Sequence, residues 1–247
     1  MNKIVEICCG SYDDARAAFL GGAHRIELNQ ALFLGGLTPG IGSLILTKQH
    51  TSLEVISMVR PRGAGFCYTE SEYNTMTEDC RLLLENGSDG IAFGFLTEDF
   101  TIDEERTRSF TDLIHSYGKT AVFHRAFDCT KDPFQAIELL IRLGVDRVLT
   151  SGLADKAVQG IDLLKKLQDL FGSRIEILAG SGINASNAKE LMDKTGITQV
   201  HSSCKAWAHD ATTKGSFVSY AYCPQDELAY DIVSTDLVKK IVSAVEN

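Results

Sequence analysis

The stretch TAVFHRAFDCTKDPFQAIELLIRLGVDRVLTSG, residues 120–152, contains one full cycle of the pattern that decides the fold. It opens with a β-rich run, expected as a strand from Thr120 to Phe127, and continues with helical spacing from Pro133 to Leu143. Gly144 then offers a residue that can end a helix, and a second strand is expected from Arg147 to Ser151. A strand, a helix and a strand in this order predict two parallel neighbours in one sheet.

The same cycle of a β-rich run and a helical segment occurs eight times along the chain. The expected strands are Ile4 to Cys8, Arg25 to Asn29, Leu53 to Arg60, Gly90 to Phe95, Thr120 to Phe127, Arg147 to Ser151, Ile175 to Ala179 and Gln199 to Cys204. The expected helices are Tyr12 to Leu20, Ile41 to Gln49, Glu72 to Glu85, Asp103 to Ser116, Pro133 to Leu143, Lys156 to Leu170, Ala185 to Lys194 and Thr235 to Val245. Eight repeats predict an α/β fold closed into a (β/α)8 TIM barrel, one domain over residues 1–247, because such barrels are typically about 250 residues long.

Composition indicates which classes of partner are disfavoured and which cellular compartment suits the protein. The formal net charge of -9 disfavours nucleic acid and an anionic membrane surface as partners. No apolar run is long enough to span a membrane, and the amino terminus lacks the features of a signal peptide. Seven cysteines at irregular spacings suit reduced thiols. We therefore expect a cytoplasmic protein.

One long irregular stretch interrupts the regular pattern, at about residues 205–230. Because compact domains rarely contain a structureless loop of that length, we expect an excursion over one rim of the barrel before the last helix. The stretch carries Trp207, Phe217, Tyr220, Tyr222 and Tyr230. These aromatic residues are suited to a subunit interface, and thus to a homo-oligomer, or to packing onto the barrel itself.

Polar side chains stand at the carboxyl ends of nearly all the expected strands, which is the rim where such barrels carry their active sites. Since successive side chains alternate between the two faces of a strand, Glu6 with Cys8, Glu27 with Asn29, and Arg60 should point into the barrel mouth. Buried carboxylates and arginines are costly unless they are paired. The group is either a structural Glu–Arg network that plugs the barrel or a clamp for an anionic substrate.

Histidines and a glycine-rich turn extend this rim. His124 and His201 end opposing strands and could serve as metal ligands, as proton-transfer groups or as hydrogen-bonded core histidines. Gly180-Ser181-Gly182 precedes a helix, an arrangement that binds phosphate through backbone N–H groups. The catalytic candidates are Glu27, His124 and Asp128. The candidates for binding a substrate or anion are Glu6, Arg60, Arg62, Arg125, Ser151, Gly180, Gly182, His201 and Ser202.

Seven segments, in order from residue 24 to residue 203, resemble the signature blocks of the CutC copper homeostasis family. They are HRIELN, GGLTPG, MVRPRGAGFCYT, FGFLTEDFTID, FHRAFDCTKDP, LGVDRVLTSG and VHSS. The resemblance implies a cytoplasmic barrel, often oligomeric, that is linked to copper tolerance and binds monovalent copper. It also implies a copper site with one cysteine on the first strand and one on the second.

Cys8 matches the first of these two cysteines, and Asn29 occupies the position of the second. An amide is a hard ligand, whereas a soft monovalent ion favours thiolates. Cys9, whose side chain should point away from the mouth, and Cys67, on a loop, are the alternatives for a second thiol.

Three functions follow as hypotheses, and the sequence leaves open whether the protein is an enzyme. The first is a copper-binding protein with Cys8 as metal ligand and His124 or His201 as helpers. The second is an enzyme acting on a small anionic or phosphorylated molecule, with arginines holding the anion and Glu27 or His124 transferring a proton. The third is a scaffold whose surface binds a protein partner.

Overall fold

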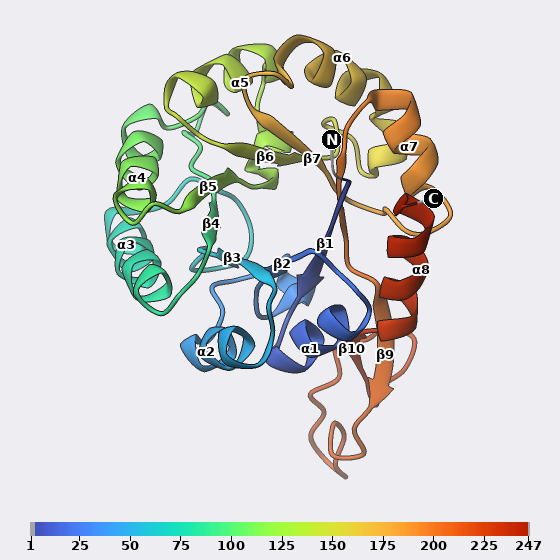
Figure 1. Ribbon diagram of the computed structural model, residues 1–247. Coiled ribbons are helices and arrows are strands. Elements are labelled where there is room, and N and C mark those ends of the chain that lie inside the picture. Colours follow the sequence, from blue (N-terminus) through green and yellow to red (C-terminus); the bar gives the residue numbers. More distant parts are fainter. Residues whose placement is uncertain (1–2, 247) are drawn as a thin grey trace.

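Eight parallel strands close into a barrel in a computed structural model that describes residues 3–246, and the strands follow one another around it in sequence order (Figure 1). Residues 1, 2 and 247, the outermost positions of the predicted domain, lie outside the described residues. The barrel strands are β1 (Ile4–Cys9), β2 (Arg25–Leu28), β3 (Glu54–Met58), β4 (Gly90–Phe93), β5 (Thr120–Phe123), β6 (Arg147–Thr150), β7 (Glu176–Ala179) and β8 (Gln199–Ser202). Pairing of β1 with β8 closes the ring. The predicted (β/α)8 TIM barrel is thereby confirmed.

Helices form a ring around this sheet, as Figure 1 shows. They are α1 (Tyr12–Leu20), α2 (Ile41–His50), α3 (Glu70–Glu85), α4 (Glu104–Ser116), α5 (Pro133–Arg142), α6 (Ile161–Phe171), α7 (Ala188–Thr195) and α8 (Thr235–Glu246). Ser11 caps α1 by accepting the N–H of Asp14, as its position predicts. Helix α3 starts earlier than Glu72, because Thr69 and Glu72 form a reciprocal capping box.

Strand β5 is shorter than the sequence predicts, and this difference shapes the rim. The strand ends at Phe123, and Arg125–Cys129 forms a 3-10 turn, η2. The cause is local: the Nδ1 atom of His124 accepts the backbone N–H of Ala126, at 3.1 Å, and so turns the chain out of the extended conformation. His124 therefore stands at the end of the strand, where the barrel opens.

The interior of the barrel is divided between an apolar side and a polar side. Ile56, Met58, Ala92 and Val122, from β3, β4 and β5, form an apolar cluster of their own. On the other side, β1, β2 and β8 contribute charged and polar groups, among them Glu6, Glu27 and His201. The main hydrophobic core lies outside the sheet, between the strands and the helices, where residues such as Val5, Ile7 and Ile26 are fully buried. The polar side thus determines where a site can form.

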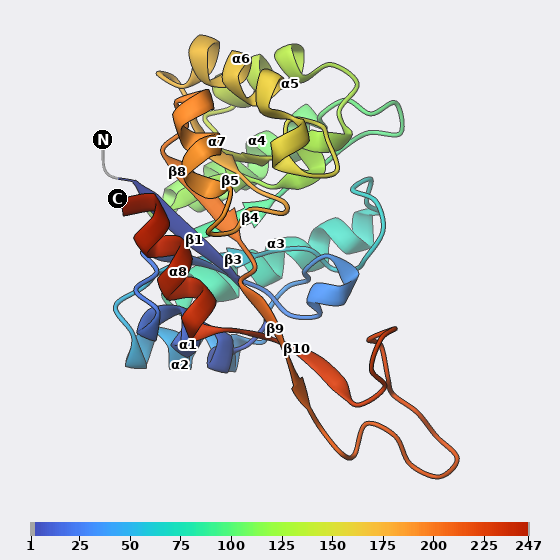
Figure 2. The same ribbon diagram turned by 90° about the vertical axis from the view of Figure 1, so that its right-hand side faces the viewer.

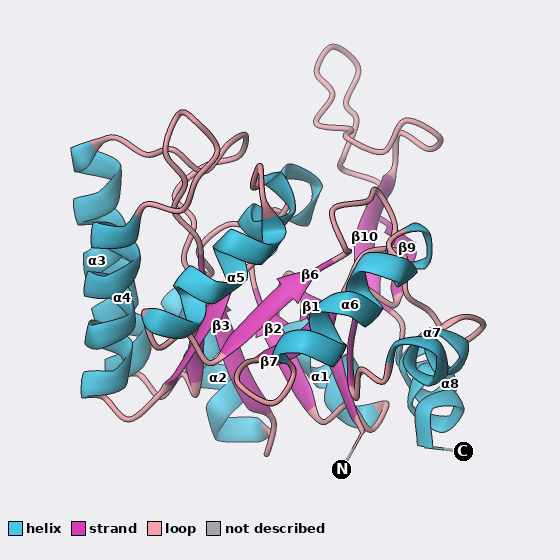
Figure 3. Cartoon of the chain, turned by 90° about the horizontal axis from the view of Figure 1, so that it is seen from above, coloured by secondary structure: helices cyan, strands magenta, loops and turns pink. Residues whose placement is uncertain are grey.

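The predicted excursion is built around an antiparallel hairpin of β9 (Lys205–His209) and β10 (Ala229–Val233), with a loop between them. The hairpin leaves the barrel beyond the end of β8 and projects away from it (Figure 2). Figure 3 shows the long loop between these strands projecting beyond the helices, whereas β10 itself contacts α1. The chain then returns to form α8, which packs against α1 and α7. Within residues 3–246, no helix has both the length and the apolar character that crossing a bilayer requires.

Candidate functional site

A cavity of about 260 Å³ opens where the strands end. It is lined by residues from both sides of the barrel and from the loops above them. They are Cys8, Glu27, Gly35, Met58, Arg60, Phe66, His124, Arg125, Leu149 and His201. The sequence-predicted rim residues Cys8, Glu27, Arg60, Arg125, His124 and His201 therefore come together around one space. Glu6 lies below them.

An ion network centred on Glu6 forms the floor beneath the polar side. Glu6 stands opposite Arg25 on one neighbouring strand and opposite His201 on the other. The Nε–H of Arg25 donates to one carboxylate oxygen, and the Nδ1 atom of His201 lies 2.8 Å from the other. Burial alone would raise the pKa of Glu6, but Arg25 and His201 outweigh it and hold the pKa well below its usual range. Glu6 is thus a fixed negative charge.

Three potential ligand atoms meet above this floor. One atom each from Cys8, Glu27 and His201 lies within 4.8 Å of the other two. Burial opposes a charge on His201, yet contacts with Cys8 and Glu6 and the nearby Glu27 raise its pKa well above the usual value. Burial raises the pKa of the Cys8 thiol, and burial together with the charge of Glu6 raises the pKa of Glu27. These shifts favour a proton on the His201 imidazole and on the Cys8 sulfur.

Asn29 completes this cluster. Its side-chain N–H group donates to Glu27 Oε2 at 3.0 Å and to Cys8 Sγ at 3.6 Å. The amide thus orients the carboxyl and the thiol toward each other, with Cys8 Sγ 3.9 Å from the same Glu27 oxygen. Asn29 acts here as a donor that positions its two neighbours.

Arg60 carries a buried positive charge in the cavity wall. Its residue surface is only 6% exposed, and its guanidinium donates to the carbonyl oxygens of Leu34, Gly36 and Ala64. Among the described residues no carboxylate forms an ion pair with it, and its Nε–H has no hydrogen-bond partner. Phe66 covers it, with the guanidinium carbon 5.2 Å from the ring centre. A buried cation without a counter-ion favours an anion nearby.

His124 is a neutral donor beside Arg60. Burial, followed by the charge of Arg60, lowers its pKa to about 3. Because Nδ1 accepts a backbone N–H, the proton of the neutral ring sits on Nε2. Nε2 is buried and has no partner in the described part of the chain. The Phe66 ring also packs on this imidazole, with 5.0 Å between the ring centres.

Asp128 organises the wall near β6 rather than lining the cavity. It accepts hydrogen bonds from the hydroxyl of Thr150 at 2.5 Å and from the N–H and hydroxyl of Ser151. It also pairs with Arg125, whose Nη2 donates to the Ser151 hydroxyl. Asp128 and Ser151 therefore hold Arg125 in place at the cavity edge.

The other predicted anion-binding residues lie away from the cavity lining. Arg62 pairs with Glu72 at 2.5 Å and stacks on Tyr68. The Ser202 hydroxyl donates to the carbonyl of Ile183, and Gly180 N–H donates to the carbonyl of Thr150. A side-chain carbon at Gly182 would meet the Lys156 side chain at 2.7 Å, so that lysine covers the turn.

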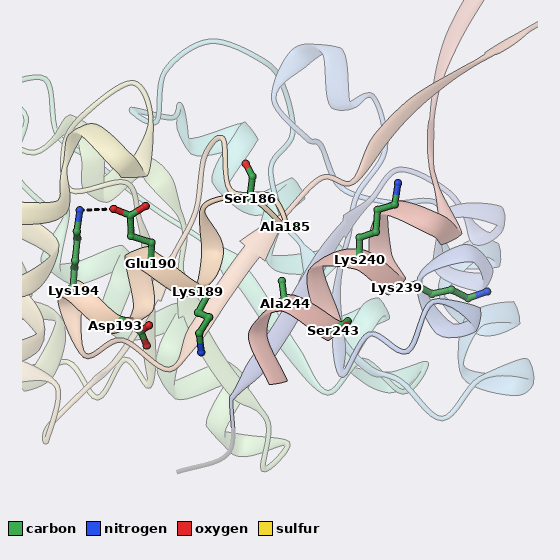
Figure 4. A pocket seen from close by; sticks show the side chains of 10 residues that line it. All are labelled: Ala185, Ser186, Lys189, Glu190, Asp193, Lys194, Lys239, Lys240, Ser243 and Ala244. Atoms are coloured by element: carbon green, nitrogen blue, oxygen red, sulfur yellow. Dashed lines mark hydrogen bonds and ion pairs between the residues drawn. The ribbon is translucent and has the colours of Figure 1, made fainter. Parts of the chain in front are cut away.

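A larger hollow of about 980 Å³ lies on the outside of the barrel, between α7 and α8 (Figure 4). Lysines and acidic residues of the two helices line it, and Lys194 pairs with Glu190 across one helical turn. These side chains are exposed and already solvated. The barrel cavity, with its buried and unpartnered donors, is therefore the better candidate site.

Comparison with known proteins places the chain in a family. The model of the CutC family matches residues 3–206. The chain belongs to the CutC family. A CutC family protein of Treponema denticola is 44% identical over 99% of both chains. A mouse protein named copper homeostasis protein cutC homolog is 41% identical, over 82% of this chain and 74% of its own. The solved structure of a CutC protein from Streptococcus agalactiae superposes with a TM-score of 0.77 and 31% identity, covering 81% of this chain and 98% of its own.

The thiols of this CutC chain do not supply a second cysteine to the cavity. Cys9 is fully buried on the outer face of β1, with its sulfur 3.6 Å from the carbonyl of Ile7. Cys67 is exposed and does not line the cavity. The thioether of Met58 is the other sulfur group in the lining.

Sequence reasoning missed Arg25 and Phe66 as parts of this CutC site. Arg25 lies two residues before Glu27 and so shares its face of the strand, a signal that alternation provides. Arg25 is not among the predicted site residues because it begins the strand, far from the rim. Phe66 has no such signal, since it lies on an irregular loop whose path depends on the whole fold.

We predict that Glu6→Gln lowers the free energy of unfolding by about 3–5 kcal/mol, because it removes the buried carboxylate that pairs with Arg25 and leaves the partly exposed Glu54, 3.8 Å from Arg25 Nη1, as a weaker partner. The pKa of Glu6 is lowered in the folded state, so its contribution is complete above the ordinary value of 4.5 and is lost as pH falls below it. Urea unfolding of the variant should therefore show a shallower loss of stability with acid than the wild type.

Glu78→Gln is the matched control for this measurement. Glu78 pairs with Arg81 on the exposed surface of α3, so its loss should cost less than about 1 kcal/mol. Equal costs for the two substitutions would contradict a structural role for the Glu6 network.

Proposed function

We propose that the barrel cavity binds a small anionic molecule and that the protein is an enzyme acting on it. The observation that carries this proposal is Arg60, a buried cation that donates to carbonyl oxygens and forms no ion pair with a carboxylate in the described part of the chain. Neutral His124 lies beside it with a free Nε2–H. Two donors of this kind in one cavity wall match the needs of an oxyanion.

Glu27 and His201 supply acid–base groups on the facing side of the cavity. Glu27 is a buried carboxyl with a raised pKa, which is how a carboxylic acid is adapted to exchange protons near neutral pH. His201 is held as an imidazolium by Glu6 and can stabilise negative charge that develops during a reaction. The arrangement suits proton transfer next to an anionic group.

The size of the cavity limits the substrate. At about 260 Å³ it is smaller than the usual range for pockets that hold drug-sized ligands, about 300–1,000 Å³. The predicted phosphate-binding turn at Gly180 and Gly182 does not line it. We therefore favour a compact anion bound through Arg60 and His124.

We predict that acetate or pyruvate raises the melting temperature of the wild type, relative to chloride at equal ionic strength. A ligand that binds only the folded state stabilises it in proportion to its occupancy. Arg60→Gln should abolish most of this shift, since it removes the buried cation. Differential scanning fluorimetry measures the effect.

Arg62→Gln is the control, because Arg62 lies on the same loop but pairs with Glu72 outside the cavity. Its response to acetate should equal that of the wild type. A shift that is the same in Arg60→Gln and the wild type would overturn the anion proposal.

A second candidate function is the binding of monovalent copper as cargo, which the cluster of Cys8, Glu27 and His201 favours. The thiol, the imidazole and the Met58 thioether in the same cavity are ligands that this ion accepts. Three features oppose copper binding. They are the amide of Asn29 in place of a second cysteine, the proton on His201 and the positive charge of Arg60. Metal binding here requires Cys8 and His201 to lose their protons.

We predict that any tight binding of monovalent copper at this site is lost in Cys8→Ala and strengthens as pH rises, because the ligands must be deprotonated. Anaerobic titration with a competing chelator, at several pH values, measures both effects. Cys67→Ala serves as the control thiol. Stoichiometric binding that survives Cys8→Ala would exclude this site.

We also propose that the protein is a cytoplasmic homo-oligomer assembled through the hairpin. All seven cysteines are free thiols, which suits a reducing compartment. Phe217 and Tyr220 are 100% and 79% exposed on the projecting loop, and Phe33 stacks on Tyr222 at its base. Large exposed aromatic residues are typical of interfaces.

We predict that light scattering after size exclusion gives a mass above the 27.0 kDa of one chain. The double variant Phe217→Ser, Tyr220→Ser should shift the mass toward that of a single chain, because it removes the apolar surface that two copies would bury. A wild-type mass of one chain would contradict the assembly.

A further inference from the structure

Cys8 differs from the other six cysteines in its surroundings. It is the cysteine that lines the barrel cavity, whereas Cys67 on a loop and Cys129 at the end of η2 are exposed and the remaining four are buried elsewhere. Cys8 is directly opposite Glu27 in the strand register and one layer above Glu6. A thiol placed in a cavity next to a carboxyl group has the components of a nucleophile and its base.

The anion-binding donors lie on the far side of the same space. Strands β1 and β5 are opposite each other in a closed ring of eight, so Cys8 on β1 faces His124 at the end of β5. His124 is only 3% exposed, and its Nε2 has no partner within residues 3–246. Arg60 adds a buried Nε–H that is also unpartnered. The donors and the sulfur therefore line the same cavity from opposite sides.

We propose that Cys8 is a nucleophile that adds to the electrophilic carbon of a small carboxylate held by Arg60 and His124. The inference rests on the proposed anion site and extends it by naming the substrate class and the reacting atom. Small 2-oxo acids fit this class, because their carbonyl carbon is adjacent to the carboxylate.

The addition step balances without a co-reactant. The bond from Cys8 Sγ to the carbonyl carbon forms while the π bond of the carbonyl breaks, and its electron pair passes to oxygen. The thiol hydrogen moves by way of Glu27, whose Oε2 lies 3.9 Å from the sulfur, to that oxygen. The product is a thiohemiketal, with the S–H group added across the C=O bond.

The resting thiol is expected to react slowly with neutral reagents. Burial raises its pKa, so little thiolate is present in the empty cavity at neutral pH. Reaction then depends on a reagent that binds through its own carboxylate and presents its carbon to the sulfur. The exposed thiols of Cys67 and Cys129 should react without such a requirement.

Iodoacetate and iodoacetamide test the inference, because they share one electrophilic carbon and differ in the carboxylate. Each forms an S–C bond to cysteine and releases iodide. Quantitative mass spectrometry of the peptides gives the alkylation rate at Cys8, with Cys67 and Cys129 of the same molecule as references. We expect the iodoacetate-to-iodoacetamide rate ratio at Cys8 to exceed the ratio at Cys67 roughly tenfold or more, as binding orients the reagent.

Saturation, protection and substitution give further expected results. The rate at Cys8 saturates with iodoacetate, and acetate protects Cys8 but not Cys67. Arg60→Gln lowers the ratio at Cys8 to that of Cys67, whereas Arg62→Gln leaves it unchanged. Glu27→Gln slows alkylation of Cys8, because it removes the group that accepts the thiol proton.

Two negative outcomes have different meanings. If acetate stabilises the wild type through Arg60 but Cys8 shows the same ratio as Cys67, the nucleophile is excluded and the anion site stands. If acetate neither stabilises the protein nor protects Cys8, and no ratio differs, both proposals are overturned. The wild-type measurement decides between these cases even if a variant fails to fold.

Discussion

The hydrogen-bonded ion network of Glu6, Arg25 and His201 is the interaction on which the rest of the site depends. A carboxylate enclosed by a barrel is tolerable only when positive groups meet both of its oxygens, and the neighbouring strands supply one each. The consequence is a fixed charge on His201 and a fixed orientation of its ring. Cys8 and Glu27 therefore lie above an ion network whose side-chain orientations and charges are costly to change.

The division of the barrel interior follows from this network. Polar groups of β1, β2 and β8 lie together, and the buried Arg147 of β6 adds a positive charge near Glu6, whereas apolar side chains of β3, β4 and β5 form a separate cluster. The cavity forms at the boundary between the two sides, near the carboxyl ends of the strands. Apolar lining such as Met58 lowers the local polarity, which strengthens the electrostatic effect of Arg60 and His124 inside the cavity.

The residues of the cavity can be compared with the needs of copper, the ion associated with the family, and with the needs of an anion. A soft cation prefers paired thiolates, yet Asn29 stands where a second thiol would be needed and uses its N–H group to hold Glu27 and Cys8. A protonated His201 and an uncompensated Arg60 place positive charge around the thiol. An anionic ligand relieves that charge, whereas a cation adds to it until protons are lost.

The sequence by itself determined the barrel, because the alternation of strands and helices and the inward parity of Glu6, Cys8, Glu27 and Arg60 are properties of local spacing. Tertiary structure decided which of the predicted residues share the cavity. Arg62 pairs with Glu72, and the Ser202 hydroxyl donates to a backbone carbonyl, so neither lines the cavity. Strand β5, predicted to reach Phe127, ends at Phe123 because His124 accepts a backbone N–H. Arg60 is held by carbonyl oxygens of two loops, and Glu6 pairs with His201 across 195 positions of sequence. Such contacts depend on strand register and loop paths, which no local pattern encodes.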